Sequence, residues 1–140
     1  RDGKFSLQYT TAAALLDGTV KIASFTDERR FRTDMVDLLG KFELRQDEAI
    51  PGDFHSMYVE VHVDLEDGSS RSALCRGPRG SWNAPMDDAD HQEKLRDCLQ
   101  YALPEAAGVT LLEQLDRLEA LDARAVESVI ALMNGGRGRN

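Results

Sequence analysis

The segment 76–85 carries the densest set of residues suited to binding a small anion. Arg76 and Arg79 stand in it beside glycines. A guanidinium group pairs with a carboxylate through two parallel hydrogen bonds, and glycine lets the backbone approach a ligand closely. In a chain of net charge −8, this concentration of positive charge predicts a carboxylate-binding element, which we call the arginine loop. Its candidate substrate-binding residues are Arg76, Arg79, Gly80 and Ser81.

A second interpretation of the arginine loop needs no ligand. Connecting segments run over the protein surface and often contain arginine, and Trp82 would pin such a segment to the rest of the molecule. The residues alone leave both interpretations open.

A cluster of potential metal ligands follows the loop. Asp87, Asp88, Asp90 and His91 are all residue types that bind metal ions. However, acids in the first turn of a helix are also favoured by the helix dipole, and no second set of ligands lies near them in the sequence. We therefore predict a helix start here and no metal site.

The remaining reactive side chains form no recognisable catalytic arrangement. The sequence contains neither a G-x-S-x-G nor a C-x-x-C motif, and we assign no catalytic residue. His62 is expected to point outward from a strand, whereas His55 lies in a Pro/Gly loop, where functional residues are more common. Two cysteines, Cys75 and Cys98, do not make the disulfide framework of a small secreted domain, so we expect a reducing, cytoplasmic setting.

Length and composition narrow the class of protein. The chain has 140 residues, of which 41% are hydrophobic and 30% charged, which is typical of one globular domain. Its acidic balance disfavours nucleic acid and anionic membranes as partners. No apolar run approaches the roughly 20 residues of a membrane span.

The first helix is defined by its two ends. Ser6 is a typical N-cap, and Gly18 follows the last apolar residue of the run, as a residue beyond a helix end often does. On this helix Phe5 and Tyr9 share one stripe, so Tyr9 is predicted to have a core or interface role rather than to donate a proton.

Alternating residues predict an antiparallel sheet in the middle of the chain. Apolar and polar side chains alternate over 41–45 and over 57–66, and residues 70–75 form a returning strand. Asp67 and Gly68 make the hairpin turn between the last two strands.

Further helices are predicted on both sides of this sheet in the sequence. Thr26 begins one or two short helices that end by Gly40. A helix starts at Asp87 and is stopped by Pro104, Thr110 opens another with a capping box, and Asp122 caps the last. The order of elements predicts an α+β fold of two layers, an antiparallel sheet with helices packed on one face.

The two ends of the chain differ from its middle. We expect residues 1–134 to form one domain and residues 135–140 a disordered tail rich in glycine and arginine. The chain opens on Arg1 rather than methionine, which favours an excised domain or a processed chain.

Four short sequence motifs, in order along the chain, resemble those of the C-terminal domain of the MmgE/PrpD family. They are F-S-L-Q-Y with L-L-D-G at 5–18, F-T-D-E at 25–28, D-G at 67–68, and P-R-G-x-x-x-x-P at 78–85 before an acidic helix start. The family includes 2-methylcitrate dehydratase, cis-aconitate decarboxylase and iminodisuccinate epimerase. The similarity runs from about Lys4 to Met133.

The resemblance implies a function shared with a second domain. Family members join a large helical domain to a smaller α+β domain and act on small di- and tricarboxylates without a metal or nucleotide cofactor. The chemistry is that of lyases or epimerases, in which a base removes a proton next to a carboxylate. This chain would then be the smaller domain, which helps to bind a polycarboxylate and close the site, and would be inactive alone.

The resemblance also indicates which surface meets that helical domain or a subunit of a homodimer. Phe5, Ser6, Gln8 and Tyr9 are its interface candidates. Many relatives have histidine directly after the P-R-G motif. This chain has Ser81 at that position, and we therefore assign no role of that histidine to it. The alternative function is a non-catalytic α+β module for binding or assembly.

Overall fold

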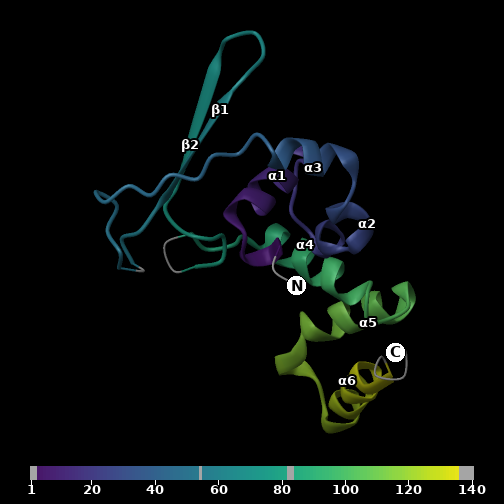
Figure 1. Cartoon of the computed structure of the whole chain (residues 1–140). Coiled ribbons are helices and arrows are strands. Elements are labelled where there is room, and N and C mark those ends of the chain that lie inside the picture. Colours follow the sequence, from purple (N-terminus) through teal and green to yellow (C-terminus); the bar gives the residue numbers. More distant parts are fainter. Residues whose placement is uncertain (1–2, 54, 82–83, 136–140) are drawn as a thin grey trace. The chain divides into compact units, whose positions relative to one another are not determined.

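The computed structural model of the chain describes residues 3–53, 55–81 and 84–135. It is mostly helical with a two-stranded antiparallel hairpin, an α+β-like arrangement (Figure 1). Two compact units make up the chain. The helical unit comprises residues 1–42 and 89–140, and the hairpin unit comprises residues 43–88.

The first half of the helical unit is a cluster of short helices. They are η1 (Gly3–Phe5), α1 (Leu7–Asp17), η2 (Ile22–Phe25), α2 (Asp27–Arg30) and α3 (Thr33–Leu39). Both predicted ends of α1 are confirmed, since the hydroxyl of Ser6 accepts a hydrogen bond from the amide of Tyr9 and Gly18 has a φ of 71°. Thr26 caps α2 in the same way, as predicted.

The core of this cluster lies between α1 and α3. Tyr9, Ala12, Ala13 and Met35 are buried there. The small alanine side chains on α1 let Met35 reach full burial with an exposed fraction of 0%. Phe25, Leu38, Leu39 and Phe42 pack around this centre.

The hairpin unit contains β1 (Val59–Asp64) and β2 (Ser70–Cys75). They pair in antiparallel register from Val59 opposite Cys75 to Asp64 opposite Ser70, and the turn uses Gly68 at a φ of 80°. These two strands confirm the predicted hairpin, and β1 is shorter than the predicted strand 57–66. Along β1 half-buried valines alternate with exposed polar residues, as a strand with one wet face requires.

The predicted strand over 41–45 is wrong. Residues 42–46 have no regular structure and pair with no strand in the described part of the chain. Phe42 is instead half-buried against the core of the helical unit, while Glu43 and Arg45 form an exposed ion pair of 2.8 Å. Leu44, the other apolar residue of the predicted strand, is 63% exposed, so the alternation does not mark a sheet face.

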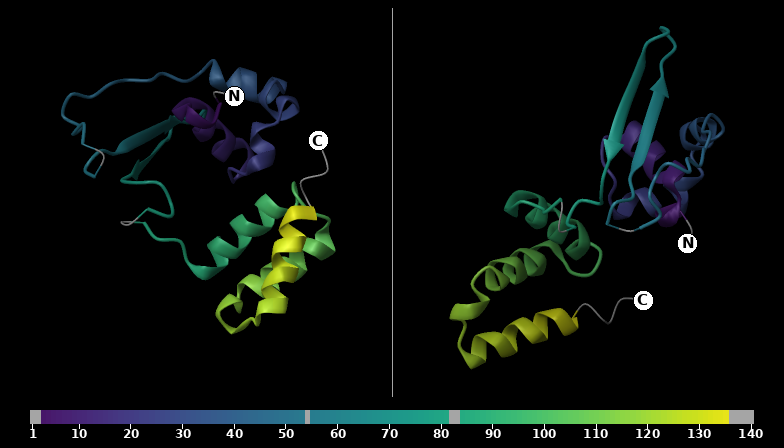
Figure 2. Two further views of the ribbon diagram at one scale, coloured as in Figure 1. Left: turned by 90° about the horizontal axis from the view of Figure 1, so that it is seen from below. Right: turned by 90° about the vertical axis from the view of Figure 1, so that its left-hand side faces the viewer.

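The second half of the helical unit holds α4 (Asp88–Leu99), α5 (Glu105–Leu115), η3 (Leu118–Ala120) and α6 (Ala123–Gly135). Helix α4 begins one residue after the predicted Asp87 and is joined to η2 by a hydrogen bond of 3.0 Å from the amide of Ile22 to the carboxylate of Asp97. Figure 2 shows α5 and α6 side by side, and Leu111, Leu112 and Val129 are buried on these two helices.

The predicted helix start at Thr110 is wrong. Helix α5 already begins at Glu105, directly after Pro104, and the hydroxyl of Thr110 donates to the carbonyl of Ala106 at 2.9 Å inside the helix. Proline suits this position because a helix start needs no amide hydrogen from it. The cap predicted at Asp122 is confirmed by a hydrogen bond of 2.8 Å from the amide of Ala125.

The predicted tail over 135–140 begins at the last residue of α6, and residues 136–140 lie outside the described residues. In the part of the chain that is described, no helix is both long enough and apolar enough to cross a bilayer.

Candidate functional site

The described part of the arginine loop is a tight, internally hydrogen-bonded turn that follows β2. The amide of Gly80 donates to the carbonyl of Ala84 at 2.7 Å. The amide and the hydroxyl of Ser81 both donate to the carbonyl of Pro78, at 3.1 and 2.7 Å. Gly80 has a φ of 94°, a conformation that residues with a Cβ rarely adopt. The turn therefore requires glycine at this position.

The base of the loop is held by the end of the hairpin. Because Val59 pairs with Cys75, the residues just beyond that pair, Tyr58 and Arg76, lie next to each other. The guanidinium carbon of Arg76 lies 5.9 Å from the centroid of the Tyr58 ring, a cation–π distance. The thiol of Cys75 donates to the carbonyl of Gly77 at 3.3 Å.

The four candidate substrate-binding residues thus lie in one short turn but differ in what they offer a ligand. The amides of Gly80 and Ser81 are already used by the turn, and so is the Ser81 hydroxyl hydrogen. Arg76 and Arg79 are exposed and carry the positive charges of the turn. Guanidinium groups are the groups here whose chemistry suits a carboxylate, whereas Gly80 shapes the loop.

The alternative that Trp82 pins the loop remains a prediction, because Trp82 lies outside the described residues.

The N-terminal interface candidates occupy different environments. Phe5 is 83% exposed, with the ammonium group of Lys4 5.1 Å from the centroid of its ring. Ser6 caps α1 and donates to Gln8 at 3.2 Å. Tyr9 is buried, its hydroxyl donates to the carbonyl of Ser24, and burial raises its pKa. Among these four, Phe5 offers the large exposed apolar side chain.

A buried arginine network ties three helices of the helical unit together. Arg29 of α2 is only 9% exposed. Its Nε and Nη2 atoms donate to the carboxylate of Asp17 at the end of α1, each at 2.9 Å, and its Nη1 donates to Asp34 of α3 at 3.2 Å. Arg32 also donates to Asp34, at 3.0 Å through Nε.

These contacts change the acidity of both carboxyl groups. The hydrogen bond from Arg29 lowers the pKa of Asp17. The hydrogen bond from Arg32 is the largest cause that lowers the pKa of Asp34 to about 2, with further contributions from the Met35 amide and Arg29. Both carboxylates are therefore ionised at neutral pH and pair with Arg29.

Sequence reasoning does not single out Arg29. The F-T-D-E word at 25–28 is followed by two arginines, at positions 29 and 30, that look alike in the sequence. Only Arg29 turns inward, whereas Arg30 pairs with Asp27 at 3.3 Å nearer the surface. The sequence offers one signal for the inward-facing arginine: it follows a capped acidic turn, and aspartates stand at the ends of both neighbouring helices.

The other reactive side chains lie at separate, exposed places in the described part of the chain. His62 lies 3.3 Å from Glu60 on the exposed face of β1, and both cysteines are free and exposed. Within residues 3–53, 55–81 and 84–135, no group of three His, Cys, Asp or Glu side chains is placed to hold a metal ion. The acidic cluster after the loop lies at the start of α4.

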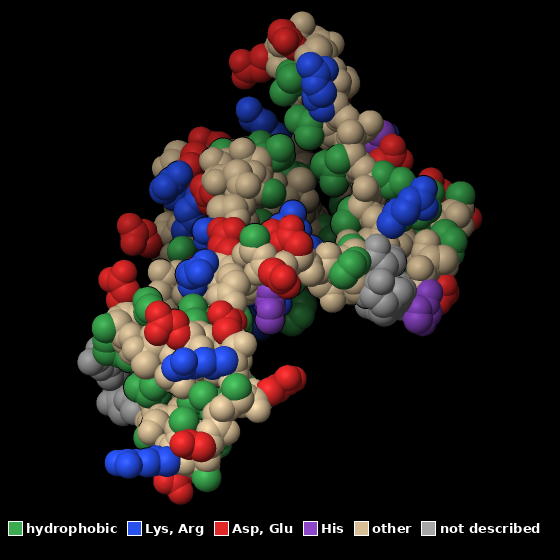
Figure 3. Space-filling model, turned by 180° about the vertical axis from the view of Figure 1, so that it is seen from behind, with side chains coloured by type: hydrophobic (Ala, Val, Ile, Leu, Met, Phe, Trp, Pro, Cys, Tyr) green, Lys and Arg blue, Asp and Glu red, His purple; other side chains and the backbone are tan. Residues whose placement is uncertain are grey.

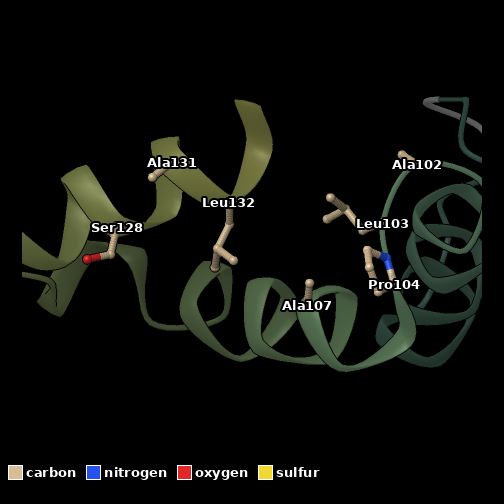
Figure 4. Close-up of a pocket in the computed structure, with 7 residues that line it drawn as sticks. All are labelled: Ala102, Leu103, Pro104, Ala107, Ser128, Ala131 and Leu132. Carbon is tan, nitrogen blue, oxygen red and sulfur yellow. The ribbon is translucent and has the colours of Figure 1, made fainter. Parts of the chain in front are cut away.

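An apolar pocket lies in the helical unit (Figure 4). It has a volume of about 580 Å³ and opens between the segment that links α4 to α5 and one side of α6. Its lining residues are Ala102, Leu103, Pro104, Ala107, Ser128, Ala131 and Leu132. None of these seven side chains carries a positive charge, so the lining lacks the chemistry to bind a polycarboxylate. On the face shown in Figure 3 acidic and basic side chains lie interspersed over the surface.

Comparison with known proteins identifies the class to which this fold and loop belong. Residues 1–120 match the family model described as the MmgE/PrpD C-terminal domain, and the chain belongs to this family. The match includes the helical cluster around α1, the hairpin and the arginine loop. Helix α6 lies beyond it.

Two curated relatives are both cis-aconitate decarboxylases. The cis-aconitate decarboxylase of Mus musculus is 27% identical over 121 residues, and that of Homo sapiens is 29% identical over 121 residues. In both cases the aligned part covers 86% of this chain and 25% of the relative. The chain therefore spans about a quarter of the length of these relatives. As their name states, they are decarboxylases, so the family includes lyases.

Proposed function

We propose that this chain is the small domain of a lyase or epimerase that acts on a small di- or tricarboxylate. Its part is to bind the substrate and to close the active site, and it needs no metal or nucleotide. The observation that carries the proposal is the glycine-shaped turn that presents Arg76 and Arg79 in a chain of net charge −8. Membership of a family that includes lyases supports it.

The chemistry explains why such a turn is useful. Removing a proton next to a carboxylate builds negative charge on a substrate that is already an anion. A guanidinium that pairs with a substrate carboxylate fixes its orientation and offsets part of its charge. We assign the acid and base residues to a helical domain and none to this chain.

We propose a tricarboxylate as the first substrate to test. The two curated relatives are named for cis-aconitate, and the family resemblance of the sequence includes 2-methylcitrate dehydratase. Both acids carry three carboxylates. Arg76 and Arg79 would bind the substrate carboxylates in either reaction, carbon–carbon cleavage as in a decarboxylase or carbon–oxygen cleavage as in a dehydratase.

The proposed partners are a helical domain and a second subunit in the cytoplasm. Phe5, at 83% exposure, is the apolar side chain that would enter such an interface, next to Ser6, Gln8 and Tyr9. We also propose that a helical layer covers the valine face of the hairpin, formed by Val59, Val61 and Val63, to complete the two-layer α+β fold.

A non-catalytic binding or assembly module is the second candidate. Phe31 at 70% and Phe5 at 83% exposure are the large apolar side chains that such an interface would bury. This module would use the same interface without a catalytic role.

The assay that separates these candidates compares the chain alone with the chain joined to a helical domain of the family. We expect the 140-residue chain to fold and to show no turnover of cis-aconitate, citrate or 2-methylcitrate, and the joined protein to convert at least one of them. Chromatographic analysis of products gives the result and includes an aspartate-derived acid for the epimerase reaction. An inert but folded joined protein would favour the assembly module.

A further inference from the structure

We propose that the outer edge of β1 is an interaction surface for a second copy of this chain, where the two hairpins join into one antiparallel sheet. This contact rests on the second subunit of the proposed function and names the strand through which the two copies meet. It involves neither the arginine loop nor a substrate. The hairpin of one copy has two strands, so the joined sheet would combine β2 and β1 of each copy.

The backbone of β1 points alternate amides and carbonyls away from β2. The amide of Leu65 donates to the carbonyl of Ser69 at 2.8 Å, just before the turn. Hydrogen-bonded pairs alternate along an antiparallel hairpin, so the valines of β1 bond to β2 while the backbone groups of Glu60 and His62 point outward. Within the described residues, β2 is the one strand that pairs with β1 (Figure 1). The outer edge of β1 therefore has the geometry to accept another strand.

Adding strands at this edge would stabilise the hairpin. A two-stranded hairpin is marginally stable in water, whereas more strands with a common apolar face are stable together. Val59, Val61 and Val63 form such a face on β1 and are half-buried. The strand contains neither proline nor lysine, the residues that commonly prevent sheet edges from pairing.

The charges on the other face of β1 are complementary to those of a second copy. Glu60 and His62 have 48% and 66% exposed side chains, and His62 Nε2 lies 3.3 Å from the Glu60 carboxylate. If two copies of β1 pair about a two-fold axis at Val61, Glu60 of each copy faces His62 of the other. An imidazole N–H donates to a carboxylate whether the ring is neutral or protonated. The paired strands then carry two such contacts, and their valines share one face.

Other registers with the same backbone pattern bring like charges together. An axis at Glu60 places the two Glu60 carboxylates opposite each other, and an axis at His62 places Glu60 opposite Asp64. An axis at Val63 places Glu60 opposite Glu66. Like charges directly opposite each other destabilise a pair of strands. Charge therefore selects the register about Val61, and that register requires a second copy of the same strand.

Sedimentation velocity of the full 140-residue chain at increasing concentration tests the proposal. We expect the wild type to dimerise, and Glu60→Lys and His62→Glu each to weaken dimerisation about tenfold because both cross-strand contacts are lost. An equal mixture of the two variants should dimerise like the wild type. The new lysine of one chain then faces the new glutamate of the other, while the remaining Glu60 faces the remaining His62. Restored dimerisation also shows that both variants fold.

Glu43→Lys is a matched control. Glu43 forms an exposed ion pair of 2.8 Å with Arg45, two positions away, in the same hairpin unit. The substitution changes the charge as much as Glu60→Lys does but lies outside β1. It should leave dimerisation unchanged. Equal weakening by Glu43→Lys and Glu60→Lys would indicate a general effect of charge and overturn the β1 contact.

Hydrogen exchange locates the contact on the strand. The outward amides of Glu60 and His62 should exchange more slowly as the concentration rises, because the second copy covers them. A chain that stays monomeric at every concentration, or a dimer that leaves these two amides unprotected, would overturn the proposal. A dimer that Phe5→Ser abolishes and that neither β1 variant weakens would overturn it too.

These outcomes are separate from those that test the proposed function. Loss of the β1 contact leaves the arginine loop as the proposed substrate-binding element, which the turnover of the joined protein tests. An inert joined protein whose chain still dimerises through β1 would overturn the catalytic proposal and support the contact between copies.

Discussion

Arginine occupies two different environments in this chain. Arg29 is nearly buried, and each side of its guanidinium donates to a carboxylate, as a charge removed from water requires. Arg79 stands on an exposed turn in which the amides of Gly80 and Ser81 donate to carbonyls of the turn itself. The first arginine joins helices, and we propose that the second binds the substrate.

The Arg29 network predicts how stability depends on pH. Asp17 and Asp34 have a lowered pKa in the folded chain, about 2 for Asp34, against roughly 4 in an unfolded chain. A carboxyl group with a lowered pKa contributes stability above its unfolded pKa and loses it as the pH falls through its folded pKa. The free energy of unfolding should therefore fall between about pH 4 and pH 2.

Chemical denaturation of the wild type and of Asp34→Asn at several pH values checks this prediction. Other carboxyl groups titrate in both proteins, so the difference between the two isolates Asp34. That difference should be largest at neutral pH and shrink as the pH falls from about 4 to about 2. A difference that stays constant over this range would show that the ion pairs of Asp34 contribute nothing to the folded state.

At the level of elements, local signals predict three of the helix starts, whereas α4 ends at Leu99, before the predicted stop at Pro104. Ser6, Thr26 and Asp122 all cap helices as their side chains suggest, because a cap depends on residues only a few positions away. The predicted strand over 41–45 and the predicted cap at Thr110 are wrong because each depends on partners that local patterns do not specify. A strand needs a neighbour, and an earlier helix start after Pro104 overrides the capping box.

The candidate site is predictable in part. The residue types of the arginine loop are visible in the sequence, and they predict the two exposed guanidinium groups as ligand-binding groups. The sequence does not show that the amides of Gly80 and Ser81 close the turn, or that Tyr58 meets Arg76, because these contacts follow from strand register and turn geometry. The burial of Arg29 likewise depends on how three helices pack.

The turn makes a prediction about Gly80. Gly80→Ala forces a side chain into a φ of 94° and brings its Cβ to 3.3 Å from the sulfur of Met86. Such a conformation costs about 1–3 kcal/mol for a residue other than glycine. Hydrogen exchange at the amides of residues 81 and 84 should speed up by about tenfold, which corresponds to about 1.4 kcal/mol and lies in that range.

Gly52→Ala is the matched control for this prediction. Gly52 lies in the same unit and has no positive φ, and a Cβ added there would meet nothing within 4 Å. Its exchange rates at residues 81 and 84 should match those of the wild type. Equal protection in Gly80→Ala and Gly52→Ala would mean that the turn tolerates a side chain and that glycine is not required there.

At the level of the whole chain, we propose that this protein acts together with a helical domain. It matches the MmgE/PrpD C-terminal domain over residues 1–120 and spans about a quarter of its curated relatives. It has exposed arginines on the hairpin unit and exposed aromatic side chains on the helical unit. We propose that the exposed arginines bind substrate and that the exposed aromatic side chains meet a partner.

Steady-state kinetics of Arg79→Ala, in the chain joined to a helical domain of the family, test whether the arginine loop binds the substrate. Loss of a charge-assisted contact of about 1.5–3 kcal/mol should lower kcat/KM about 10- to 150-fold, mainly through a higher KM for the polycarboxylate. The melting temperature should change little, because an exposed loop arginine contributes little to stability. Arg124→Ala, at an exposed arginine on α6, should leave both quantities unchanged. Unchanged kinetics with a marked fall in melting temperature in Arg79→Ala would mean that the arginine loop is structural and does not bind the substrate.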